Sequence, residues 1–110
     1  MEYKLFNRLY NEALSYNEFE MYVAERGWQD WMEGYSADEI VAILQEIYSL
    51  AYCSVGELKK GMSRVEFGRN YGIPIRTLED WDAGKRMPPN YVVALIAYTV
   101  FTDTGRKTNE

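Results

Sequence analysis

The sequence contains no histidine and only one cysteine, Cys53. Histidine is the commonest general base near neutral pH and the commonest metal ligand, so its absence argues against most acid–base and metal-dependent active sites. A lone cysteine cannot form an internal disulfide or build a Cys-rich zinc site, and it favours a reducing, cytoplasmic setting. We therefore expect a protein that is not an enzyme and holds no metal or cofactor. We interpret Cys53 as a small core residue, with a reactive thiol as the alternative.

Long apolar runs are also missing. No stretch of about 18 apolar residues is present, so the sequence predicts no membrane span. The N-terminal segment MEYKLFNRLY lacks the basic start and apolar run of a signal peptide. Apolar residues still make up 47% of the 110 residues, which is enough for the core of one domain, with room for an appendage.

Negative charge is concentrated in one half of the chain. Residues 1–53 carry three basic and ten acidic groups, a balance of −7, whereas residues 54–110 carry nine basic and seven acidic groups, a balance of +2. Together they give the net charge of −5. This asymmetry suggests two surfaces with different roles. The alternative is that the acidic helices only keep a small protein soluble.

Apolar residues recur at helical spacing along most of the chain, and no strand pattern of useful length is present, so we expect an all-α fold. Up to residue 53 the pattern predicts helices over 2–15 and 37–52, the latter capped by Ser36 and Glu39, with another helix between them that Asn17 and Glu20 begin and Gly27 ends. A last helix should follow Pro89.

One further helical turn is expected at WQDWMEGY. Trp28, Trp31 and Met32 follow helical spacing there, and we interpret them as packed on the core. The alternative is an exposed hot spot for a protein partner, because tryptophan is enriched in such surfaces.

Residues 63–89 read as two short helices joined by a tight turn. Ser63 can cap the first helix in a capping box with Glu66, and Gly72 can end it in a left-handed conformation. Pro74 suits the first position of the second helix. Gly68 lies inside the first helix, where glycine costs about 1 kcal/mol relative to alanine. We attribute it to close approach of the second helix, whose Leu78 and Trp81 should face inward.

This spacing resembles the Cro/repressor-type, or Xre-like, helix-turn-helix family over residues 63–98, about a third of the chain. The turn, the Trp81 plug and the trailing Gly-Lys-Arg carry the resemblance. In that family the start of the second helix reads base edges in the major groove. The positions that match here are Pro74, Ile75, Arg76, Thr77 and Asp80. The resemblance also implies phosphate contacts from Arg64, Lys85 and Arg86, to which we add Arg69.

The sequence therefore predicts a repressor-like transcriptional regulator that binds double-stranded DNA, with Arg76 bidentate to a guanine edge. The resemblance implies that the last helix can form a homodimer seam. We expect an acidic helical extension at 1–53, packed on a helix-turn-helix domain at 54–102, and a polar tail at 103–110. One alternative is a protein-interaction module, an antitoxin or inhibitor whose acidic half binds a partner. Another is a helical hairpin that binds nothing.

Overall fold

The computed structural model describes residues 1–103, and these residues form helices and no strands. The predicted all-α fold is confirmed. The predicted tail at 103–110 lies, apart from Asp103, outside the described residues. In chain order the elements are α1 (Tyr3–Ala13), α2 (Phe19–Arg26), the 3-10 turn η1 (Asp30–Met32), α3 (Ala37–Ala51), α4 (Val55–Leu58), α5 (Arg64–Tyr71), α6 (Ile75–Asp82) and α7 (Asn90–Asp103).

Serine side chains cap the starts of α3, α4 and α5. At α3, the Ser36 hydroxyl accepts from the Glu39 amide while the Glu39 carboxylate accepts from the Ser36 amide, the predicted capping box. The start of α4 has the same arrangement in Ser54 and Glu57. That pair follows the same sequence rule.

The predicted start of α2 is wrong by one position. Asn17 does not cap the helix, because Glu18 occupies the cap position in an extended conformation, without a side-chain cap bond. The preceding turn is held by tertiary bonds: the Tyr16 carbonyl accepts from the hydroxyls of Tyr48 at 2.8 Å and Tyr52 at 2.6 Å. These bonds fix the chain ahead of α2, so the helix begins at Phe19. Gly27 ends it at φ +59°, as predicted.

The core is one continuous cluster in which α1, α3 and α7 pack on one another. Helix α2 packs on α3, and α4 packs on α7. Phe6 of α1 lies at the centre, with its ring 5.2 Å from those of both Tyr98 and Phe101 of α7. Helices from both sides of the predicted boundary at residues 53 and 54 therefore share this core. The division into an extension and a domain stays a prediction.

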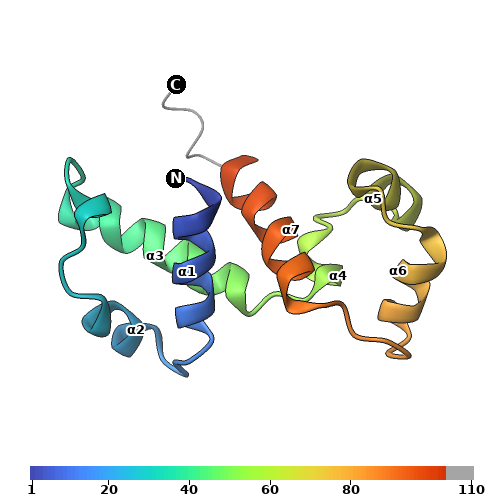
Figure 1. Cartoon of the computed structure of the whole chain (residues 1–110), viewed down its shortest axis with the longest axis horizontal. Helices are drawn as coiled ribbons and strands as arrows, with labels where there is room; N and C mark the ends of the chain where they lie inside the picture. Colours follow the sequence, from blue (N-terminus) through green and yellow to red (C-terminus); the bar gives the residue numbers. More distant parts are fainter. Residues whose placement is uncertain (104–110) are drawn as a thin grey trace.

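Helices α5 and α6 pack chiefly against each other and form one end of a molecule that measures 43 × 32 × 21 Å (Figure 1). Helix α2 and the connection to α3 lie at the other end, beyond α1 (Figure 1). Two connections, 59–63 and 83–89, join the α5–α6 end to the rest. No helix within residues 1–103 combines the length and apolar character needed to cross a membrane.

Candidate functional site

The turn between α5 and α6 is built from three local features. The Ser63 hydroxyl accepts from the Glu66 amide at 3.1 Å and caps α5. The return bond of the predicted capping box, from the Ser63 amide to Glu66, is not formed among the described residues. Gly72 ends α5 in the left-handed region at φ +68°, as predicted. The Ile73 amide then donates to the Gly68 carbonyl at 2.9 Å and closes the turn.

Gly68 lies at a close contact of α5 with the turn and with α6. A Cβ atom on it would lie 2.7 Å from the Ile73 carbonyl oxygen and 3.2 Å from Cδ1 of Leu78. The first contact is with backbone, which cannot move aside as the end of a flexible side chain can. Gly68 and Leu78 are both buried. The predicted close approach is confirmed, and the turn carbonyl contributes to it as well as α6.

Helix α6 begins one residue later than predicted. Pro74 is the N-cap, at φ −58° and ψ 142°, and Ile75 is the first helical residue. An extended ψ suits a cap rather than a first helical position, and the Pro74 carbonyl accepts from the Thr77 and Leu78 amides. The amides of Ile75 and Arg76 have no acceptor among the described residues. The first turn of α6 therefore presents free N–H groups.

The side chains predicted to meet DNA lie at this end of the molecule, and most are exposed. Pro74, Ile75 and Arg76 are exposed at the start of α6, whereas Thr77 and Asp80 are half-buried behind them. Arg69 and Lys85 are exposed as well. Within residues 1–103, Arg76, Arg69 and Lys85 form no ion pair.

Two of the predicted phosphate contacts are already paired within the chain. Nε of Arg64 lies 3.0 Å from Oδ2 of Asp82, and its Nη1 lies 3.8 Å from Glu79. Lys59, which the sequence did not single out, lies 3.7 Å from the same Asp82 oxygen. Arg86 lies 3.8 Å from Asp80. Exposed pairs of this kind are worth about 0–1 kcal/mol, so a stronger anion can displace the carboxylates.

Asp80 also holds the connection that follows α6. Its backbone carbonyl accepts from the Lys85 amide at 2.9 Å and the Arg86 amide at 3.4 Å. Gly84, at φ +75°, lets the chain turn back for these bonds. These bonds hold Lys85 and Arg86 next to α6.

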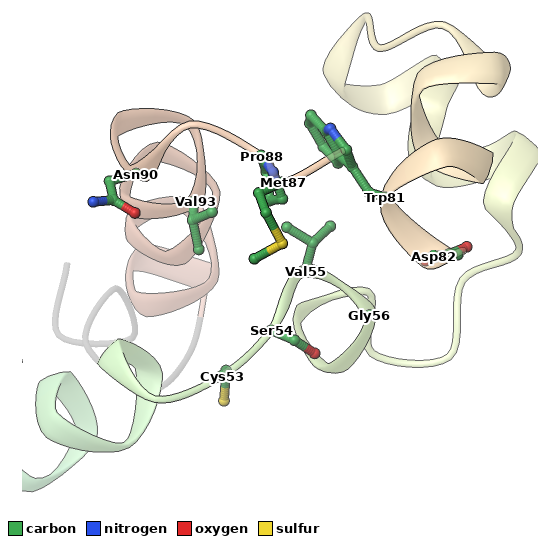
Figure 2. Close-up of a pocket in the computed structure, with 10 residues that line it drawn as sticks. All are labelled: Cys53, Ser54, Val55, Gly56, Trp81, Asp82, Met87, Pro88, Asn90 and Val93. Atoms are coloured by element: carbon green, nitrogen blue, oxygen red, sulfur yellow. The ribbon is translucent and has the colours of Figure 1, made fainter. Parts of the chain in front are cut away.

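A groove of about 400 Å³ separates the α5–α6 end from the rest (Figure 2). Its apolar wall comes from Val55, Trp81, Met87 and Val93, which belong to four separate segments. No sequence pattern brings these residues together, and the sequence did not predict this groove. Cys53 lies at its edge, where its thiol donates to the Ser49 carbonyl at 3.3 Å. Burial, and secondarily the Glu57 carboxylate, raises the pKa of this thiol, which makes it less reactive.

A second groove, of about 330 Å³, runs between the α5–α6 turn and α7, and Ile73, Leu95 and Thr99 are among the residues that line it. The Tyr71 and Thr99 hydroxyls lie 2.5 Å apart beside it. Leu95, which lines this groove, and Tyr91 near the start of α7 are both exposed. These residues belong to the helix for which the sequence predicted a homodimer seam, which stays a prediction.

Over residues 1–103, no group of three or more Cys, Asp or Glu side chains is arranged to hold a metal ion. The candidate site at the α5–α6 end consists of basic side chains, the exposed start of α6 and the carboxylates among them. In comparisons with known proteins, no family model, no curated protein and no solved structure matches this chain.

Proposed function

We propose that the protein is a sequence-specific DNA-binding regulator of transcription, repressor-like, that inserts the start of α6 into the major groove. The observation that carries this proposal is the first turn of α6, where Arg76 is exposed and has no ion-pair partner among the described residues. The resemblance of residues 63–98 to Cro/repressor-type proteins supports the same function.

The arrangement of α5 and α6 supports insertion of a helix. An α-helix fits the major groove when its leading residues project beyond the neighbouring helix. Pro74, Ile75 and Arg76 are exposed, whereas Gly68 and Leu78 hold the other side of α6 against α5. The free amides of Ile75 and Arg76 add donors at the positive end of the helix dipole, where phosphate oxygens bind well.

The basic side chains around α6 support contact with the DNA backbone. Arg69 and Lys85 are unpaired within the described part of the chain, and two phosphate contacts imply a log–log salt slope of about −1.8. Arg64 and Arg86 can exchange their carboxylates for phosphates, which would steepen the slope to about −3.6. Glu79, Asp80 and Asp82 oppose binding, so we expect modest affinity for random sequence.

The test is selection of binding sites from random duplexes at a stated salt concentration, followed by fluorescence anisotropy on the selected and on random sequence. Arg76→Ala should weaken binding to the selected site by about 5- to 150-fold, which corresponds to 1–3 kcal/mol, and binding to random duplex far less. Lys4→Ala, which removes an exposed cation from α1, is the control and should change neither.

Two results would contradict this proposal. If the selection enriches no sequence, the protein does not bind DNA in a sequence-specific way. An equal loss on both duplexes in Arg76→Ala would remove Arg76 as a base reader and leave it as a phosphate contact.

A further inference from the structure

Trp28 lies on the surface and not in the core where the sequence placed it. Its side chain is 66% exposed, and it makes no ring contact or hydrogen bond with the described residues. Met21 and Tyr35, which lie before and after it in the chain, are also exposed. The other two residues of the predicted turn do pack inward: Met32 is buried and Trp31 is half-buried. The alternative of an exposed hot spot is therefore favoured for Trp28.

The chain on either side of Trp28 is held in place, although Trp28 itself is free. The Gln29 side chain accepts from Nε1 of Trp31 at 2.6 Å and from Arg8 at 3.1 Å, and it donates to the Arg26 carbonyl at 3.3 Å. The rings of Trp31 and Tyr35 meet edge to face at 6.4 Å. A preorganised segment loses little conformational entropy when it binds a partner.

The chain on both sides of Trp28 is rich in carboxylates. We call residues 18–39 the acidic end. Its seven carboxylates are all exposed: Glu18, Glu20, Glu25, Asp30, Glu33, Asp38 and Glu39.

The one cation of the acidic end does not balance this charge at the surface. The Arg26 side chain is only 6% exposed, and it is paired with Glu12 and stacked on the Tyr22 ring at 4.8 Å. Arg8 of α1, which binds Gln29, is the cation next to the segment.

We propose that the acidic end binds a lysine- and arginine-rich segment of a partner protein, with Trp28 as the aromatic anchor. A guanidinium or ammonium group binds favourably over an indole face, and the aliphatic stems of these side chains pack on it. The carboxylates attract such a segment and repel nucleic acid, anionic lipid and the acidic end of a second copy. Because the acidic end lies opposite α5 and α6, this binding does not depend on DNA binding (Figure 1).

The probe for the test is a fluorescein-labelled synthetic peptide of lysine and arginine with a leucine at every fourth position, titrated with the full chain in the absence of DNA. Trp28→Ala should weaken binding by about tenfold or more, as loss of a hot-spot residue does, whereas Trp28→Phe should retain most of it. Tyr91→Ala is the matched control, since Tyr91 is 67% exposed on α7, and it should bind like the unchanged chain.

A pair of charge variants separates a local surface from net charge. Glu25→Gln with Asp30→Asn should weaken binding and flatten its salt dependence. Glu66→Gln with Asp103→Asn removes the same charge elsewhere and should have little effect. Circular dichroism of each variant confirms that it folds.

Four results would overturn the proposal. The first is that the peptide does not bind the unchanged chain. The second is that Trp28→Ala and Tyr91→Ala bind the peptide equally well. The third is that the two double charge variants weaken peptide binding equally. The fourth is self-association of the chain that Trp28→Ala abolishes, since it would assign the surface to a second copy.

Discussion

A single methyl group at Gly68 should loosen the packing of α6 on α5. In Gly68→Ala the new Cβ would lie 2.7 Å from the Ile73 carbonyl oxygen, closer than real Cβ contacts come, and 3.2 Å from Leu78. Leu78 can rotate, but the carbonyl belongs to the turn that Gly72 and the Ile73–Gly68 hydrogen bond hold. The turn must therefore shift, and α6 with it.

The magnitude follows from a comparison with Gly56, the other glycine inside a helix of residues 1–103. A Cβ on Gly56 would meet only the Ser54 hydroxyl, at an ordinary 3.7 Å. Both glycines gain up to about 1 kcal/mol of helix propensity on change to alanine. Only Gly68→Ala also suffers the overpacking, which costs about 1–3 kcal/mol. The difference between the two variants should therefore be about 1–3 kcal/mol, because the propensity gain largely cancels.

The assay is urea unfolding of both variants followed by circular dichroism, with hydrogen exchange of the α5 and α6 amides as a local measure. Local exchange is needed because these helices pack chiefly on each other and can open without global unfolding. In Gly68→Ala the α5 and α6 amides should exchange faster, whereas Gly56→Ala should leave them unchanged. If the two variants are equally stable and exchange alike, Gly68 is not at a close contact and the turn geometry described above is wrong.

Two further changes test the charges near α6 and the buried core. Asp82→Asn should steepen the salt slope of DNA binding by about 0.9 if Asp82 holds Arg64 away from a phosphate, because the substitution removes the nearer of the two carboxylates beside Arg64. Asp103→Asn should not change the slope. An unchanged slope in Asp82→Asn would mean that Asp82 does not hold Arg64 away from a phosphate. Tyr22→Phe should lower the free energy of unfolding by about 0.5–1.5 kcal/mol at neutral pH, since the buried Tyr22 hydroxyl donates to the Leu9 carbonyl at 2.8 Å. Burial raises the pKa of Tyr22 above its ordinary 10.0, so the unfolded chain loses this proton first and the free energy of unfolding should fall above pH 10.0. In Tyr22→Phe the free energy of unfolding should fall less steeply above pH 10.0. If urea unfolding gives the same pH profile for the variant and the unchanged chain, Tyr22 is not a source of the effect.

Local sequence patterns determined where several of the helices begin or end. The capping pairs at Ser36 and Ser54, and the left-handed glycines at 27, 72 and 84, act over three or four residues and need no tertiary contact. The predicted helix over 37–52 corresponds to α3, and α1, α2 and α7 all pack on it. Such signals can be read directly because partner and position lie in the same helical turn.

Tertiary structure decided which surface residues are available to bind. Arg64 and Asp82 lie far apart in sequence, yet they form an ion pair. Arg64, a predicted phosphate contact, is therefore already paired with a carboxylate of the same chain. Asn17 has the right chemistry for a cap, but the tyrosine hydroxyls that bind the Tyr16 carbonyl move the start of α2. Trp28 follows the same helical spacing as Trp31, and only packing against the core distinguishes them. Exposure and pairing depend on contacts between distant segments, and hydrophobic spacing within one segment contains no information about those contacts.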